Sequence, residues 1–176
     1  MRIDHIAYRV KDRYKTVKFF EEGFGYKVAN EFEVNFDDGS FAKCIALEPP
    51  EKIQCMPYSH VAFGVWDLHT APEVFVSDGT PDSIVGKWVA ERGDVGGIHH
   101  IAYQVDSVED TMKEWKEKGY AEFTTDKPLM CPGLTQCFTK PSDLTGVIYE
   151  FIERAEGTQG FCKDNVKDLM ESTEGT

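Results

Sequence analysis

The sequence has no long hydrophobic run and an excess of negative charge. No apolar stretch in its 176 residues approaches the ~18 needed to span a bilayer, and the N-terminus shows no signal-peptide pattern. We therefore expect a cytoplasmic protein with no membrane partner. The net charge of −12 repels phosphate backbones, so a nucleic-acid partner is not expected either.

Paired cysteine motifs are also missing. The five cysteines are an odd number and include no C-x-x-C pair, which argues against a zinc knuckle or a disulfide framework. Free thiols in a reducing compartment are the simpler interpretation. The hydrophobic content of 41% is nevertheless enough for a core, in one domain or in two small modules that share it.

An internal repeat organises the chain. The segment 3–10, IDHIAYRV, recurs at 98–105 as IHHIAYQV, with six of eight positions identical. A capping residue follows each copy, Asp12 or Ser107, and each helical pattern then ends at a Gly-Tyr pair that begins with Gly25 or Gly119. The duplication predicts an α+β fold of two paired βαβββ modules within one domain, at 1–92 and 97–154, followed by a C-terminal tail at 155–176.

Strand patterns follow each Gly-Tyr pair. We expect strands at 26–34, 41–47, 59–66 and 72–77 in the first module, and at 121–124, 135–139 and 146–152 in the second. The first module therefore has an extra hairpin. A helix over 83–91, capped by Asp82, links the modules, and the tail has a short amphipathic segment at 166–170. Two modules related by a pseudo-twofold axis would enclose a cleft suited to a ligand.

Two histidines occupy the same position in the two repeats. Strand alternation puts His5 on the face that points into the cleft, and the repeat puts His100 there too, whereas His99 should face the opposite way. Glu150 interrupts an apolar run in the last strand, where a carboxylate is costly unless it is paired or bound to a metal. Glu73 stands in an apolar run of the corresponding strand of the first module.

These residues predict a site for one divalent metal ion. His5, His100 and Glu150 form a donor set that suits Fe²⁺, with open positions for dioxygen and substrate. With Glu73 as a fourth ligand, the site would instead suit Ni²⁺, Co²⁺, Zn²⁺ or Mn²⁺ acting as a Lewis acid. A single histidine or glutamate is more often structural, so the hypothesis depends on the repeat. His60 and His69 are interpreted as structural or surface residues.

With these features the chain resembles the vicinal oxygen chelate superfamily, which includes glyoxalase I, methylmalonyl-CoA epimerase and the extradiol dioxygenases. The resemblance covers nearly the whole chain. It implies that His5, Glu73, His100 and Glu150 are the metal ligands, with Glu73 and Glu150 as candidate catalytic carboxylates.

The second half is similar to the catalytic half of 4-hydroxyphenylpyruvate dioxygenase. The stretches LTQCFTKP at 134–141, YEFIER at 149–154 and QGFCKDN at 159–165 follow the order of that family. This resemblance implies three ligands, His5, His100 and Glu150, a substrate contact from Gln136, and a C-terminal lid whose Phe161 stacks on an aromatic substrate. The chain lacks the N-terminal half of that enzyme, and its lid lacks two of the usual glycines.

The region between the modules looks more like methylmalonyl-CoA epimerase, in the segments 72–84 and 96–101. Glu73 fits the four-ligand site of that type. The epimerase also needs a carboxylate base from the third strand, however, and residues 54–65 contain no Asp or Glu.

Three functions are therefore open. The favoured one is a non-haem Fe²⁺ dioxygenase-like oxidoreductase that chelates a small oxo- or hydroxy-acid. The second is a glyoxalase- or epimerase-type lyase or isomerase, in which the metal stabilises an enediolate while a carboxylate moves a proton. The third is a non-catalytic binding protein on the same scaffold. In each case the expected partner is a small-molecule substrate or ligand, and a homodimer is left open.

Overall fold

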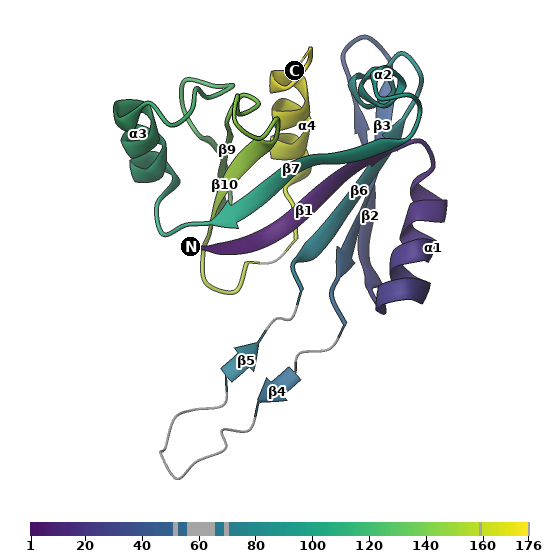
Figure 1. The fold of residues 1–176 in the computed structure, drawn as a ribbon, viewed down its shortest axis with the longest axis horizontal. Helices are drawn as coiled ribbons and strands as arrows, with labels where there is room; N and C mark the ends of the chain where they lie inside the picture. Colours follow the sequence, from purple (N-terminus) through teal and green to yellow (C-terminus); the bar gives the residue numbers. More distant parts are fainter. Residues whose placement is uncertain (51–52, 56–65, 69–70, 159, 176) are drawn as a thin grey trace.

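The computed structural model describes residues 1–50, 53–55, 66–68, 71–158 and 160–175. Ten strands and four helices are assigned in this part of the chain (Figure 1). The strands are β1 Arg2–Val10, β2 Lys27–Asn35, β3 Phe41–Glu48, β4 Ile53–Cys55, β5 Trp66–Leu68, β6 Glu73–Gly79, β7 Gly96–Gln104, β8 Leu129–Cys131, β9 Leu134–Phe138 and β10 Ile148–Arg154. The helices are α1 Arg13–Phe24, α2 Ile84–Glu91, α3 Val108–Lys118 and α4 Lys163–Ser172.

The main sheet has the symmetry that the repeat predicts. Its strand order is β2-β3-β6-β1-β7-β10-β9-β8, and β4 pairs with β5 as a separate hairpin. The two repeated strands, β1 and β7, lie antiparallel at the centre. On either side, β6 runs parallel to β1 as β10 runs parallel to β7. This arrangement confirms the α+β fold of two paired modules and brings the two repeat copies into direct contact.

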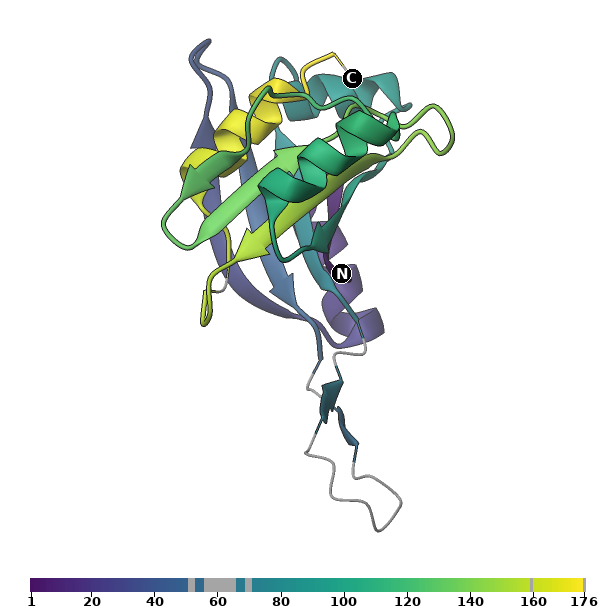
Figure 2. The ribbon, with the colours of Figure 1, turned by 90° about the vertical axis from the view of Figure 1, so that its left-hand side faces the viewer.

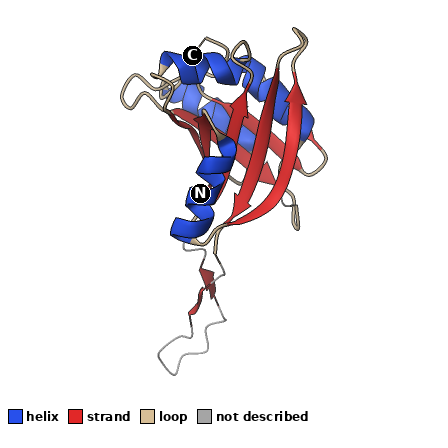
Figure 3. Ribbon diagram, turned by 90° about the vertical axis from the view of Figure 1, so that its right-hand side faces the viewer, coloured by secondary structure: helices blue, strands red, loops and turns tan. Residues whose placement is uncertain are grey.

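The sheet curls, and its two faces are covered by different helices (Figures 2 and 3). On one face, Val17 of α1 packs against the strands of the first module, and Met112 of α3 packs against those of the second. On the other face, Val166 and Met170 of α4 pack with Phe75. Helix α4 contacts β2, β8 and β9, so it crosses the concave face of the sheet.

Among the described residues, no helix has both the length and the apolar character that a membrane crossing requires.

The local signals at the ends of α1 and α3 act as the sequence predicts. The side chain of Asp12 accepts a hydrogen bond from the amide of Lys15, and Ser107 accepts one from the amide of Asp110. Gly25 and Gly119 end the helices in the left-handed conformation, with φ of 76° and 66°. Both repeats therefore use the same start and stop signals.

Two expectations about the elements need revision, and a third cannot be compared. Within the expected strand 121–124, only an isolated bridge from Phe123 to Thr139 forms, whereas β8 pairs with residues 134–136 of β9. The amphipathic segment at 166–170 extends in both directions to become α4. The expected strand 59–66 lies outside the described residues except for Trp66, which begins β5.

The N-cap of α2 is Ser83 and not Asp82. The Ser83 hydroxyl accepts a hydrogen bond from the amide of Gly86, 3.0 Å away, and Ser83 is buried. Asp82 precedes the cap and is exposed. The sequence offers two adjacent residues that both cap helices well, and only the backbone geometry decides between them.

The cap assignment gives a stability prediction. We expect Ser83→Ala to lower the free energy of unfolding by about 1 kcal/mol, because the Gly86 amide loses its acceptor. For a chain of this size, that corresponds to a fall in Tm of about 2–4 °C in calorimetry. The matched control is Asp82→Ala, with an expected change of less than about 0.5 kcal/mol. The opposite ranking of the two variants would restore Asp82 as the cap.

Candidate metal centre

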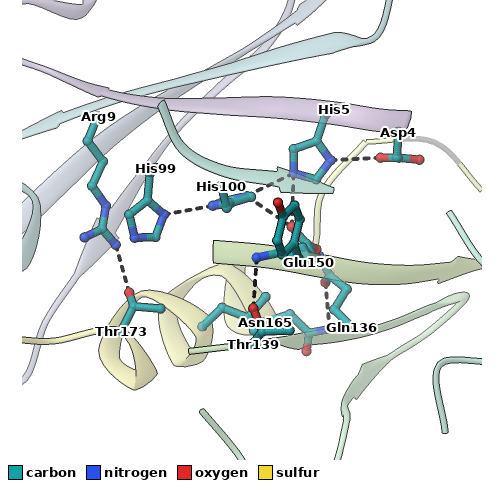
Figure 4. Close-up of polar contacts among 12 residues, drawn as sticks. Asp4, His5, Arg9, His99, His100, Gln136, Thr139, Glu150, Asn165 and Thr173 are labelled. Carbon is teal, nitrogen blue, oxygen red and sulfur yellow. Dashed lines mark hydrogen bonds and ion pairs between the residues drawn. The ribbon is translucent and has the colours of Figure 1, made fainter. Parts of the chain in front are cut away.

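Three neighbouring strands at the centre of the sheet carry the candidate ligands. His5 lies on β1, His100 on β7 and Glu150 on β10, and these strands are adjacent in the sheet. All three side chains point to the concave face and are buried, with exposed fractions of 2%, 8% and 1% (Figure 4). The pairing of the two repeats therefore brings together residues that are up to 145 positions apart in sequence.

The three donor atoms form a nearly equilateral triangle. His5 Nε2 and His100 Nε2 are 3.2 Å apart, and each is 3.1 Å from Glu150 Oε2. A divalent metal bound at about 2.1 Å gives ligand–ligand edges of about 3.0 Å at octahedral angles and about 3.4 Å at tetrahedral angles. The observed edges lie in this range. In the described part of the chain, this is the one group of three or more His, Cys, Asp or Glu donors that converges closely enough to hold an ion.

The three groups shift one another's pKa values. Burial raises the pKa of Glu150, but His5 and His100 outweigh this effect and lower it to about 2. Burial lowers the pKa of His5, whereas the charges and hydrogen bonds of Glu150 and Asp4 raise it to about 9. For His100, burial dominates and the pKa is lowered. The site thus holds an anionic carboxylate between a neutral imidazole and one that binds a proton.

Asp4 orients His5 from behind. The pairing of β1 with β7 skips Asp4, so this residue forms a bulge and its side chain lies on the same face as that of His5. Asp4 Oδ1 accepts a hydrogen bond of 2.8 Å from His5 Nδ1, which leaves Nε2 directed at the other donors. Arg154 donates two hydrogen bonds of 2.9 Å to Asp4 and one of 2.7 Å to the carbonyl of Gly160.

Gln136 orients Glu150. Its amide nitrogen donates a hydrogen bond of 2.6 Å to Glu150 Oε1, the oxygen that does not face the histidines. Its amide oxygen accepts a hydrogen bond of 3.1 Å from Asn165 on α4. Gln136 also lines the cavity. Its predicted contact with a substrate stays a prediction.

The predicted orientation of His99 is wrong because the β1–β7 pairing contains a second bulge, which lies on β7. Ala7 pairs with His100 and the next residue, Tyr8, pairs with Ile98, so His99 has no partner across the strand. The bulge breaks the alternation, and His99 and His100 point to the same face. Their Nδ1 atoms are 2.8 Å apart.

Glu73 lies beside the site but outside the donor triangle. On β6 it pairs with His5, whereas Glu150 on β10 pairs with Ala102, which is two residues beyond His100. The position of the first module that corresponds to Glu150 is therefore Phe75, which pairs with Ala7. Burial raises the pKa of Glu73, and the charge of Asp4 adds to this effect. The match between the two glutamates that the repeat predicts is displaced by two residues.

A cavity adjoins the three donors. Its wall is mainly apolar and aromatic, and Phe161 contributes to it as expected, with its ring 4.9 Å from those of His5 and Phe75. Phe138 contacts His100, with ring centroids 4.6 Å apart. His60 and His69 lie outside the described residues. An aromatic role for Phe161 toward a substrate stays a prediction.

The sequence did not predict the residues that surround the candidate ligands. Asp4, Arg154 and Asn165 hold the candidate ligands in place through hydrogen bonds, and further polar side chains, among them Arg9 and His99, line the cavity. Arg9 gave a usable signal, because alternation on the first strand puts it on the same face as His5. The other four depend on bulges and on contacts between distant segments, which the pattern does not contain.

Solved structures share this fold. A hypothetical protein from Bacillus halodurans C-125 is 24% identical, with a TM-score of 0.64 over 90% of this chain and 98% of that chain. Methylmalonyl-CoA epimerase from Streptomyces coelicolor is 26% identical, with a TM-score of 0.59 over 91% and 99%. A 4-hydroxymandelate synthase mutant from the same organism is 18% identical, with a TM-score of 0.73 over 98% of this chain but only 54% of its own.

The sequence itself matches a family model. None of the curated proteins compared with the chain matches it. Residues 4–138, however, match the model of the glyoxalase/bleomycin resistance protein/dioxygenase superfamily, and this range includes His5 and His100. The matched range covers well over half of the chain, and the paired modules described above agree with it. The chain therefore belongs to the glyoxalase/bleomycin resistance protein/dioxygenase superfamily, also known as the vicinal oxygen chelate superfamily.

Proposed function

We propose that the protein is a non-haem Fe²⁺ dioxygenase-like enzyme that chelates a small oxo- or hydroxy-acid. The observation that carries this proposal is the triangle of His5, His100 and Glu150 donors, with Phe75 at the position of the first module that corresponds to Glu150. Two histidines and one carboxylate with open positions form the donor set of non-haem Fe²⁺ oxygenases. Ni²⁺, Co²⁺, Zn²⁺ and Mn²⁺ can also bind to these three donors.

The residues of the chain prepare this site for a cation. Asp4 holds His5 through Nδ1, so that Nε2 points at the other two donors, and Gln136 holds Glu150 through Oε1, so that Oε2 points at the histidines. When bound, the metal would supply Lewis acidity toward substrate oxygens and, as Fe²⁺, the capacity to activate dioxygen. The ligand positions are thus fixed before binding, which lowers the entropic cost of assembling the site.

The aromatic wall would exclude water from the reacting atoms. Phe161 and Phe138 each contact one of the histidines, and Phe75 contacts Phe161. An apolar boundary of this kind strengthens the electrostatic interactions inside the cavity and protects reactive species from side reactions.

Elemental analysis followed by oxygen measurement tests the proposal. Protein purified without chelator should contain iron or take it up, and Fe²⁺-loaded protein should consume dioxygen with at least one member of a panel of 2-oxo and 2-hydroxy acids. His100→Ala is the matched inactive control. Protein that purifies with Ni²⁺ or Zn²⁺ and consumes no dioxygen with any acid of the panel would remove the proposal.

An epimerase- or lyase-type reaction is the second candidate, and Glu73 favours it. This carboxylate lies beside His5 on the neighbouring strand and has a raised pKa, as a group that accepts and returns a proton requires. The similarity to methylmalonyl-CoA epimerase spans nearly both chains. Solvent deuterium incorporation into a thioester or hemithioacetal, lost in Glu73→Gln, would select this candidate over the oxygenase.

Metal affinity is expected to depend on pH through His5. Because the pKa of His5 is raised to about 9 in the metal-free site, the imidazole carries a proton at pH 7 that a metal must displace. We therefore expect affinity to rise by about tenfold per pH unit up to about pH 9 and then to level off. Calorimetry with Zn²⁺ in two buffers of different ionisation enthalpy should show about one proton released per ion at pH 7. Release of none would contradict the assignment.

A further inference from the structure

Arg9 is a buried cation that has no carboxylate partner among the described residues. It lies on β1, is 2% exposed, and lines the same cavity as the three metal-binding candidates (Figure 4). One guanidinium nitrogen, Nη2, donates a 3.0 Å hydrogen bond to Thr173 Oγ1. The other, Nη1, is buried and has no hydrogen-bond partner within the described ranges. Burial lowers the pKa of Arg9 only to about 9, so the group is cationic at neutral pH.

The other well-buried arginines are compensated. Arg13 pairs with Asp78 over 2.9 Å, and Arg154 makes two hydrogen bonds of 2.9 Å to Asp4. In the part of the chain that the structure describes, Arg9 has no such ion pair. A buried charge is costly unless an opposite charge or several acceptors compensate it. In a protein with a net charge of −12, leaving this one cation unpaired in a cavity points to an anionic ligand.

His99 adds a second donor to the same region. If His100 presents Nε2 to a cation, its proton must lie on Nδ1, and that proton is donated to His99 Nδ1, 2.8 Å away. His99 then carries its own proton on Nε2, which is buried and has no partner in the part of the chain that the structure covers. The side chain of His99 lies between Arg9 and His100 (Figure 4). Among the described residues, this part of the cavity wall therefore has two donors without partners, Arg9 Nη1 and His99 Nε2.

We infer that the substrate has a second carboxylate, remote from its metal-chelating end, and that Arg9 and His99 bind it. This inference rests on the proposed function and narrows the substrate class to 2-oxo or 2-hydroxy dicarboxylic acids. His5 and Arg9 are four residues apart on one strand, about 13 Å between Cα atoms. Both side chains reach into the cavity, so a short acid can contact both ends. A planar two-oxygen anion matches two neighbouring N–H donors.

Calorimetry on the Zn²⁺-loaded protein tests the inference without turnover. The probes are 2-oxoglutarate and 2-oxoadipate, compared with 2-oxopentanoate and 2-oxohexanoate, which have the same chain lengths but no second carboxylate. We expect each dicarboxylic acid to bind at least about 30-fold more tightly than its monoacid partner. Arg9→Met should abolish this preference and leave monoacid affinity within about threefold. Arg9→Lys keeps the charge without the planar fork and should be intermediate.

The control for a general charge effect is Arg92→Met. Arg92 is exposed and stacks on Trp88 outside the cavity, so its removal should leave the preference intact. Zn²⁺ affinity and circular dichroism of each variant report whether the fold and the metal site persist. If Arg9→Met does not fold, the preference in wild type and Arg9→Lys still decides the matter.

The outcomes separate this inference from the proposed function. Equal binding of dicarboxylic acids and monoacids would overturn the second-carboxylate site and leave metal chelation intact. Glutarate, which has two carboxylates but no oxo group, is the complementary probe. Glutarate binding that depends on Arg9, without any 2-oxo monoacid binding, would support the site and count against oxo-acid chelation.

Discussion

Replacing Glu150 by glutamine should reduce divalent-metal affinity by more than about a hundredfold, beyond the range usual for residues that only orient a ligand. The change removes the anionic donor of the triangle at nearly constant volume. It also creates a conflict with Gln136, whose amide nitrogen donates a hydrogen bond of 2.6 Å to Glu150 Oε1. The single oxygen of the new amide can satisfy Gln136 or the metal, but not both. Zn²⁺ and Fe²⁺ dissociation constants, measured anaerobically for iron, check this result.

Glu73→Gln is the matched control for that experiment. Glu73 occupies the neighbouring strand and is also partly buried, but it is not part of the donor group. We expect its substitution to change metal affinity by less than about threefold, well below the effect of losing a residue that orients a ligand. A loss comparable to that of Glu150→Gln would establish a four-ligand site and would favour the Lewis-acid candidate over the oxygenase.

Replacing Asp4 by asparagine should weaken both metal binding and the fold. Asp4 accepts a hydrogen bond from His5 and two from Arg154, and the Asp4 and Arg154 side chains are 6% and 8% exposed. Loss of the carboxylate should lower metal affinity by about 10- to 100-fold, because His5 is no longer oriented. It also leaves Arg154 buried without its counter-charge, which should cost about 3 kcal/mol. Calorimetry should show a fall in Tm of about 6–12 °C.

A double substitution separates the two effects. Asp4→Asn combined with Arg154→Met removes the uncompensated cation, so the Tm should recover most of the loss. Metal affinity should stay low, since His5 still lacks its partner. If affinity recovered together with stability, Asp4 would matter only through folding and not through the orientation of His5.

The fold could be predicted from the sequence, because the repeat shows the same order of strand, cap and helix twice. The copies at 3–10 and 98–105 become the two central strands, and the caps at Asp12, Ser107, Gly25 and Gly119 end up where local chemistry puts them. His5, His100 and Glu150 could be grouped for the same reason. A buried carboxylate in an apolar strand must be paired or bound to a cation, and the two histidines at matching positions of the repeat indicate its neighbours.

The register of the outer strands could not be predicted in the same way. Glu73 and Glu150 each stand in an apolar strand, yet Glu73 pairs with His5 whereas Glu150 pairs with Ala102. A displacement of two residues keeps the side chain on the same face, so strand alternation does not reveal it. The bulges at Asp4 and His99 are also invisible to a two-residue period, because each adds one residue that the pattern does not mark.

The donor set has an unequal origin in the two modules. One donor comes from the first module, His5, and two come from the second, His100 and Glu150, so neither half of the duplication contains a complete site. A cation held there would bridge the two modules across the β1–β7 interface, and its binding free energy would stabilise their association. Loss of the ion would then lower the stability of the contact between the two modules.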